Sequence, residues 1–184
     1  MTTPDMNIKT QSNLQEILKQ IRLLLLDVDG VLTDGAIIYT DQGKEIKRFS
    51  VKDGLGLRLL MDAGVTVGII TGRRSRALTA RCRNLGIDLV YDNVKDKVAA
   101  LEEILGKTGI GENETAFAGD DLPDICVMNR VGLAIAVSDA SDETRGAARL
   151  ITDRKGGDGA VREVCELILK AKGEWENITQ RFSR

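Results

Sequence analysis

Short apolar runs alternate with amphipathic segments along most of this chain. The apolar runs predict buried strands at residues 22–27, 65–70, 88–91, 115–118, 132–137 and 149–152. Between the runs, apolar positions recur at helical spacing and predict helices over 54–63, 75–85, 95–107, 159–171 and 174–182, with a short helix at Pro123. This alternation predicts an α/β fold, a doubly wound, Rossmann-like and mostly parallel sheet with helices on both faces.

Residues 35–50 interrupt this alternation. The stretches 35–40 and 44–50 flank Asp41-Gln42-Gly43, which is typical of a small β-hairpin. A hairpin alone is only marginally stable in water. This one carries an apolar stripe made by Ile37, Tyr39, Ile46 and Phe49. We therefore expect neighbouring subunits to bury it.

The chain, residues 1–184, is expected to form a single domain. Its core spans about 21–172, and a C-terminal tail at 173–184 carries Trp175, Ile178 and Phe182 at helical spacing. We expect the tail to pack on its own subunit or on a neighbour. The alternative is that it reaches into a neighbouring active site.

Charge and composition exclude several kinds of partner. The 26 basic and 28 acidic residues nearly balance, so nothing global indicates binding to nucleic acid or to an anionic membrane. No apolar run approaches the roughly 20 residues that span a bilayer, and no signal peptide is visible, so we expect a soluble, cytoplasmic protein. Cys82, Cys126 and Cys165 lie far apart and are expected to be reduced, packed thiols.

The absence of histidine restricts the chemistry further. The sequence contains none, which excludes a Ser-His-Asp triad, a His-ligated zinc site and an imidazole base. Acid–base catalysis would have to use Asp, Glu, Lys, Tyr or Cys. No Walker P-loop or GxGxxG motif occurs either, so binding of ATP or a dinucleotide is not indicated.

Two carboxylates directly follow the first predicted strand. Asp27 and Asp29 end the leucine run at 23–26, and buried carboxylates cost free energy unless a cation compensates them. Mg²⁺ is the simplest such cation. One Asp can then bind the metal and attack an electrophile, while the other, on the same side of the strand, transfers a proton. An EF-hand loop is excluded because Val31 and Ile38 would occupy its fifth and twelfth positions.

Further polar groups follow the later strands. Because the carboxyl ends of the strands of a doubly wound sheet converge, Asp27 and Asp29 are expected to meet Thr71-Gly72-Arg73, Lys97, Asp120-Asp121 and Asp124. The set offers a nucleophile, an acid/base, a hydroxyl, an ammonium group and metal-binding carboxylates. It matches a phosphoryl group, whose charge is spread over three oxygens. The sequence therefore predicts an aspartate-nucleophile phosphatase.

Each motif also has a simpler structural interpretation when taken alone. Thr71-Gly72 and Gly119-Asp120-Asp121 could each cap a helix, and Lys97 could be a solvated charge with Lys95 as its competitor. Asp34 could only shape the turn into the hairpin. The glycines of Gly156-Gly157-Asp158-Gly159 could form a turn or let the backbone approach a substrate closely.

The ordered set of motifs resembles the haloacid dehalogenase superfamily of phosphatases. The resemblance covers about residues 21–172 and rests on D-x-D-G-V from Asp27, I-I-T-G-R from Ile69, a lysine, and G-D-D-L-x-D from Gly119. It implies that Asp27 forms an aspartyl-phosphate and that Asp29 protonates the leaving group and then activates water.

The resemblance also implies roles for the remaining site residues. Mg²⁺ would be bound by the Asp27 carboxylate, the Asp29 backbone carbonyl and Asp120. Asp121 and Asp124 would orient water molecules on the metal. Phosphate oxygens would be held by Thr71, Gly72 and Lys97.

Within the superfamily, the chain resembles a capless branch whose members dephosphorylate sugar acids. The implied substrate is 3-deoxy-D-manno-octulosonate 8-phosphate, of lipopolysaccharide core sugar synthesis, and the alternative is a sialic-acid-type nonulosonate 9-phosphate. Relatives of the second kind carry Glu at the position of Arg73, and Arg favours the first because it can pair with the sugar carboxylate. With a hairpin in place of a cap domain, the resemblance implies a homotetramer whose neighbouring subunits supply the lid.

Two other classes of protein could use similar groups. A signalling receiver domain has an acidic metal pocket, an acceptor Asp, a Thr and a Lys, but it places the paired acids first, whereas here Asp27 comes first. A catalytically silent binding module would not need Asp29 two residues after the nucleophile. Asp29 therefore separates the phosphatase from both alternatives.

Overall fold

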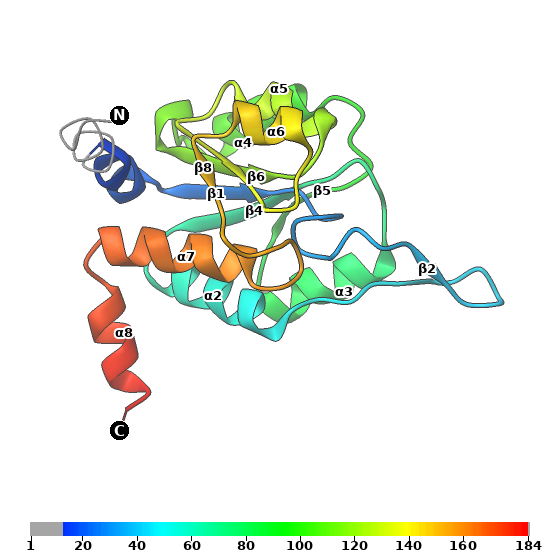
Figure 1. The fold of residues 1–184 in the computed structure, drawn as a ribbon, viewed down its shortest axis with the longest axis horizontal. Coiled ribbons are helices and arrows are strands. Elements are labelled where there is room, and N and C mark those ends of the chain that lie inside the picture. Colours follow the sequence, from blue (N-terminus) through cyan, green and yellow to red (C-terminus); the bar gives the residue numbers. More distant parts are fainter. Residues whose placement is uncertain (1–12, 184) are drawn as a thin grey trace, which may run out of the picture.

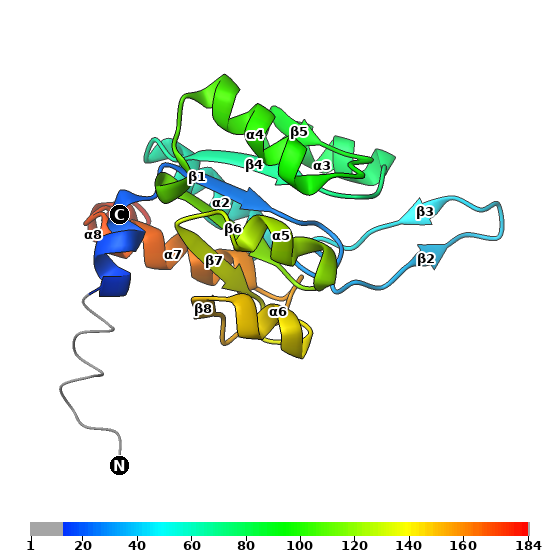
Figure 2. The same cartoon turned by 90° about the horizontal axis from the view of Figure 1, so that it is seen from above.

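The computed structural model describes residues 13–183. Within that range, six parallel strands form one sheet in the order β5-β4-β1-β6-β7-β8 (Figure 2). The strands are β1 (Leu23–Leu26), β4 (Thr66–Ile70), β5 (Leu89–Tyr91), β6 (Thr115–Gly119), β7 (Leu133–Ala136) and β8 (Leu150–Ile151). The chain builds from β1 to β5 on one side and then returns to form β6 on the other. Ligands of open α/β sheets bind at the carboxyl ends of the strands, beside such a reversal.

Helices cover both faces of this sheet (Figure 1). One face carries α2 (Val51–Asp62), α3 (Arg76–Leu85) and α7 (Ala160–Ala171), and the other carries α4 (Lys97–Thr108), α5 (Ile125–Met128) and α6 (Asp142–Ala147). Two 3₁₀ turns, η1 (Glu112–Glu114) and η2 (Leu122–Asp124), flank β6, and α8 (Trp175–Arg181) follows α7. The predicted doubly wound sheet is confirmed. The helix at 13–20 and the short α6 were not predicted.

The central strand β1 is the most buried element of the sheet. All of its leucines are fully buried, and they pair in register with β4 on one side and β6 on the other. Burying a leucine side chain contributes about 1.5–3 kcal/mol. The residues that directly follow β1 are therefore attached to a tightly packed strand.

Side-chain caps set the start of α2 and α4. The Ser50 hydroxyl accepts a hydrogen bond from Asp53 N at 3.4 Å, so α2 begins at Val51, three residues before the predicted start. The Asp96 carboxylate accepts from Val98 N and Ala99 N, both at 3.0 Å. This cap makes Lys97 the first residue of α4.

The hairpin is shorter than predicted and projects beyond the carboxyl end of the sheet (Figure 2). Its strands are β2 (Ile38–Tyr39) and β3 (Glu45–Ile46), which pair antiparallel. Ile37, Tyr39 and Ile46 of the expected apolar stripe are exposed, whereas Phe49 is half-buried. Within one chain, the described residues leave most of this stripe uncovered.

The C-terminal tail packs on its own subunit through part of its length. Ile178 is buried, and the Trp175 ring lies 5.4 Å from the Arg162 guanidinium and 5.5 Å from the Lys170 ammonium of α7. Phe182 remains exposed. No helix in the part of the chain that the structure describes is long and apolar enough to cross a membrane.

The three cysteines are free thiols in this structure. Cys82 and Cys165 are buried, as expected, but Cys126 is exposed. The prediction of a packed thiol is therefore wrong for Cys126, because the short helix α5 turns this position toward solvent.

Candidate active site

A pocket of about 280 Å³ lies at the carboxyl ends of the central strands. Every residue that the sequence predicted for the site lines it: Asp27, Asp29, Thr71, Gly72, Arg73, Lys97, Asp120, Asp121 and Asp124, together with Pro123. Asp27 follows β1, Thr71 follows β4 and Asp120 follows β6. The predicted convergence is thus observed.

The turn after Asp29 requires a glycine. Gly30 has φ +95°, and a Cβ atom there would lie 2.0 Å from Asp120 Oδ2. Both the left-handed backbone and the lack of space exclude a side chain. Gly30 therefore lets the chain leave β1 while the Asp120 carboxylate stays against it.

Lys97 bridges two carboxylates at the base of the pocket. Its Nζ atom lies 2.7 Å from Asp27 Oδ1 and 2.6 Å from Asp124 Oδ1. Burial alone would lower the pKa of Lys97, but Asp27 and Asp124 outweigh burial and raise it. The side chain is therefore a fixed cation beside Asp27, and the competing Lys95 is exposed.

Three carboxylates face one another around this lysine. Oxygen atoms of Asp27, Asp120 and Asp124 all lie within 4.8 Å of one another. Burial, followed by the nearby Asp27 and Asp124 charges, raises the pKa of Asp120 to about 7. Burial also raises the pKa of Asp27 to about 6, against the opposing effect of Lys97. One lysine does not compensate three carboxylates, and an oxygen-only donor set with excess negative charge fits a hard divalent cation such as Mg²⁺.

Asp29 is not one of these three clustered carboxylates, although it lines the same pocket, and it contacts two cations. Its Oδ1 atom accepts a hydrogen bond from Lys47, and its Oδ2 atom lies 3.4 Å from Arg73 Nε. Glu45 lies beside them, 2.8 Å from Lys47 and 3.6 Å from Arg73. The sequence interpretation missed Lys47 and Glu45. The sequence signal for them is weak: alternation about the exposed Ile46 places its charged neighbours on the opposite face, but β3 is only two residues long.

The remaining predicted residues have distinct surroundings. Thr71 is buried, and its hydroxyl accepts from Arg73 N at 3.4 Å. Asp124 Oδ2 accepts from Asp120 N at 3.0 Å, which joins it directly to the carboxylate cluster. Asp121 is exposed and caps η2 by accepting from Leu122 N at 2.9 Å.

Two weaker motifs make structural contacts. Asp34 accepts from Ala36 N at 3.1 Å and pairs with Arg48 at 2.7 Å, so it shapes the turn into the hairpin. Gly157 N donates to Val31 O at 2.9 Å, and a Cβ atom on Gly156 would lie 1.6 Å from Gly30 O. These glycines let their loop approach the loop after β1.

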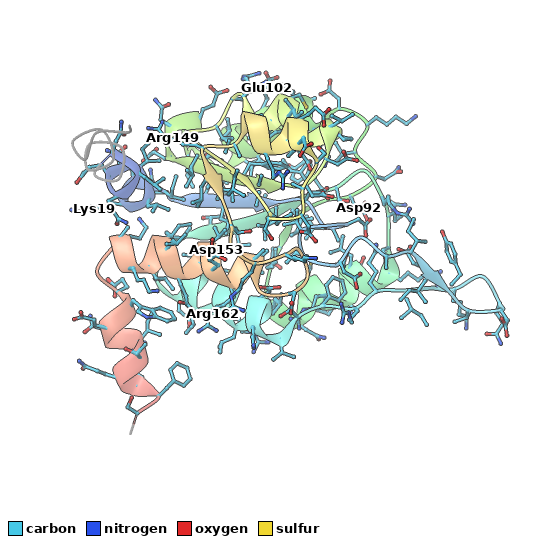
Figure 3. All side chains as sticks on the ribbon, in the orientation of Figure 1. Lys19, Asp92, Glu102, Arg149, Asp153 and Arg162 are labelled. Atoms are coloured by element: carbon cyan, nitrogen blue, oxygen red, sulfur yellow. The ribbon has the colours of Figure 1, made fainter. Side chains whose placement is uncertain are left out.

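A larger hollow, about 620 Å³, lies against α7 and includes Asp153 and Arg162 (Figure 3). Two of its carboxylates already have partners: Arg162 Nε donates to Glu166 at 2.8 Å, and Glu163 accepts from the backbone N–H of Asp153 at 2.9 Å. The smaller pocket, in contrast, gathers buried and uncompensated groups, and we therefore assign the active site to it.

Known proteins share both this sequence and this fold. Residues 87–164 match the family model described as haloacid dehalogenase-like hydrolase. The 3-deoxy-D-manno-octulosonate 8-phosphate phosphatase KdsC of Yersinia pestis is 46% identical over 159 residues, which cover 86% of this chain and 85% of that protein. The chain belongs to this phosphatase family of haloacid dehalogenase-like hydrolases.

Solved structures of the family superpose over almost the whole chain. The Moraxella catarrhalis phosphatase, in complex with magnesium ion, phosphate ion and a KDO molecule, has a TM-score of 0.91 and 42% identity over 93% of this chain and 98% of that chain. The cobalt-bound Haemophilus influenzae phosphatase has a TM-score of 0.87 and 36% identity over 91% of this chain and 99% of that one. The family resemblance drawn from the motifs is confirmed.

Proposed function

We propose that this phosphatase hydrolyses 3-deoxy-D-manno-octulosonate 8-phosphate through an aspartyl-phosphate on Asp27. The observation that carries the proposal is the contact between Asp27 and Lys97, 2.7 Å apart in a pocket that also contains Asp29. Lys97 opposes the effect of burial on the pKa of Asp27 and so favours the anion, and a carboxylate beside a fixed cation is suited to attack a phosphorus atom that carries negative charge.

The residues around Asp27 would bind the phosphoryl group. The Lys97 ammonium and the Thr71 hydroxyl are donors at the pocket floor, and the exposed backbone of Gly72 lies beside them. Such donors stabilise the charge that spreads over the phosphoryl oxygens in the transition state.

Asp29 would carry the proton in both half-reactions. As the sugar–oxygen bond to phosphorus breaks, Asp29 gives a proton to the leaving alkoxide, and Asp27 becomes phosphorylated. Asp29 then takes a proton from the water molecule that attacks the aspartyl-phosphate and restores free Asp27.

Asp27, Asp120 and the Asp29 backbone carbonyl would hold Mg²⁺, with Asp124 close to them. When bound, Mg²⁺ neutralises charge on the phosphoryl oxygens and on the carboxylates. Lys97 and the Asp120 backbone amide hold Asp124 in place, and the exposed Asp121 could orient water at the rim.

Arg73 would select the sugar acid. Its guanidinium lies at the pocket mouth and is 40% exposed, so it can reach a carboxylate on the incoming sugar. The octulosonate relatives support an eight-carbon substrate. A nonulosonate 9-phosphate remains the second candidate, although the resemblance drawn from the sequence gives its phosphatases Glu at the position of Arg73.

We further propose that the enzyme works as a homotetramer whose neighbouring subunits cover the hairpin and close the pocket. The exposed Ile37, Tyr39 and Ile46 support this assembly, since a projecting apolar hairpin is marginally stable alone.

Phosphate release from purified enzyme tests the proposal. The assay compares 3-deoxy-D-manno-octulosonate 8-phosphate, a sialic-acid-type 9-phosphate and a simple hexose phosphate, each with and without Mg²⁺. A Mg²⁺-dependent preference for the first is expected. A preference for the nine-carbon acid would keep the mechanism and reassign Arg73, while no release from any of them would contradict the proposal.

A further inference from the structure

Lys47 is a buried cation on an otherwise exposed hairpin. Its side chain is 2% exposed, although that of its neighbour Arg48 is 70% exposed. It leaves the end of β3 and reaches into the site between Asp29 and Glu45. An ammonium group is buried at a high cost unless carboxylates compensate it, so this placement depends on both partners.

The contact with Lys47 gives the two carboxylate oxygens of Asp29 different surroundings. Lys47 donates to Oδ1. Oδ2 is buried and has no hydrogen-bond partner among residues 13–183, because Arg73 Nε, at 3.4 Å, satisfies only the distance of an ion pair. Oδ2 is therefore the Asp29 oxygen whose hydrogen-bonding capacity is not used by the described residues.

Glu45 provides the second attachment of Lys47. Its carboxylate lies 2.8 Å from the ammonium, and its other cationic neighbour, Arg73, lies 3.6 Å away. Glu45 lies on β3 and Lys47 follows directly after its end, two residues along, so the hairpin backbone sets the distance between them. The position of the Lys47 ammonium relative to Asp29 is thus fixed.

We propose that Lys47 is a positioning residue that holds Asp29 Oδ1 and so directs Oδ2 to the leaving oxygen and then to water. This inference rests on the proposed role of Asp29. In the first step the proton on Oδ2 moves to the sugar oxygen as its bond to phosphorus breaks, and Asp27 takes the phosphoryl group. In the second step water forms the new bond to phosphorus, the bond to Asp27 breaks, and a proton from water returns to Oδ2. Lys47 keeps its protons throughout.

A substrate with a good leaving group distinguishes a loss of Asp29 positioning from a general disruption of the active site. The value of kcat/KM depends on the steps up to and including release of the alcohol. A sugar alkoxide needs a proton at that step, whereas 4-nitrophenolate does not. Lys47→Met should lower kcat/KM for the sugar phosphate by about 10–100-fold, as misplacing a catalytic group does. The same variant should lower kcat/KM for 4-nitrophenyl phosphate by less than about threefold.

Lys44→Met is the matched control, because Lys44 lies on the same hairpin and is exposed. It should leave both substrates at the wild-type rate. Equal losses on both substrates in Lys47→Met, or no loss on either, would overturn the proposal.

A double variant tests the route through Asp29. In an Asp29→Asn background, Lys47→Met should add less than about twofold to the loss with the sugar phosphate, since the group that it positions is already disabled. Additive losses would contradict the positioning role. If Asp29→Asn itself keeps full turnover, the proposed function fails; if Asp29→Asn is slow and only the Lys47 results disagree, the inference alone fails.

Glu45→Gln keeps the proposal testable if Lys47→Met does not fold. It retains the size of the side chain and weakens the second attachment of Lys47, together with the longer contact to Arg73. A smaller but still leaving-group-dependent loss is expected, and an equal loss with both substrates would contradict the proposal.

Discussion

Two groups of charges lie in or beside the pocket, and they are held in different ways. The carboxylate cluster, Asp27, Asp120 and Asp124 with Lys97, sits at the ends of buried strands and the start of a capped helix. The hairpin group, Lys47 and Glu45, sits on a projecting ribbon with an exposed apolar stripe. The first is fixed by the core of one chain, and the second depends on what stabilises the ribbon.

The two groups of charges are suited to different parts of the reaction. The carboxylate cluster has the groups for phosphoryl transfer, whichever molecule carries the phosphate. The hairpin group touches Asp29 and Arg73, the residues proposed to handle the leaving sugar. Changes in the core should therefore stop all turnover, whereas changes in the hairpin should act mainly on sugar phosphates.

The largest effect is expected from Asp27→Asn. Loss of the nucleophile should lower kcat by on the order of 10⁴-fold or more with every phosphate ester, because no aspartyl-phosphate can form. Phosphate release and trapping of the phosphoenzyme measure this. Asp142→Asn, on the surface of α6 and 87% exposed, is the control and should match the wild type. Retained turnover in Asp27→Asn would show that another residue accepts the phosphoryl group.

Asp29 lines the pocket of the carboxylate cluster and contacts Lys47 of the hairpin group, and Asp29→Asn should rank second. It should slow turnover of the sugar phosphate by about 10²–10⁴-fold, while Mg²⁺ binding, measured by calorimetry, stays near the wild-type value. Unchanged turnover would remove Asp29 from the mechanism and would favour a receiver-like or silent pocket.

The carboxylate cluster could be predicted from the sequence because it follows chain order. Buried strands can be recognised in the sequence as apolar runs, and polar residues at their carboxyl ends must converge in a doubly wound sheet. Asp27, Thr71 and Asp120 were found in this way. Lys97 was uncertain beside Lys95 until the Asp96 cap fixed the start of α4.

The hairpin group could not be predicted in the same way. The contacts of Lys47 and Glu45 depend on how far the ribbon bends back over the pocket, and β2 and β3 are each only two residues long. Short strands carry little periodicity, so the direction of their charged side chains is decided by tertiary contacts. The helix at 13–20 and α6 were missed for a related reason, since a short helix shows too few turns for a reliable apolar pattern.

A charge on the apolar stripe should have a moderate effect. Ile37→Lys should weaken assembly, and should lower activity on the sugar phosphate by about tenfold at dilute enzyme, because an unpaired lysine in a subunit interface costs several kcal/mol. Sedimentation velocity and activity against enzyme concentration measure both effects. Ile151→Lys, at an exposed position of β8, is the control. A wild-type enzyme that sediments as a monomer at micromolar concentration would contradict the proposed tetramer.

The smallest effect is expected in the stability of the metal-free enzyme. Because the pKa of Asp120 is raised from 3.8 to about 7, the folded state binds this proton more tightly than the unfolded state does. The Asp120 contribution should therefore favour folding at low pH, fade as pH rises from about 4, and become fully unfavourable above about pH 7.

At pH 8, Asp120→Asn should raise the Tm of the metal-free protein by on the order of 5 °C, and Mg²⁺ should stabilise the wild type but not this variant. Scanning calorimetry at pH 5 and pH 8, with and without Mg²⁺, measures the difference. A variant less stable than the wild type at pH 8 would show that the Asp120 carboxylate stabilises the core cluster without a cation, and the contrast between a cation-dependent core and a self-compensated hairpin group would then fail.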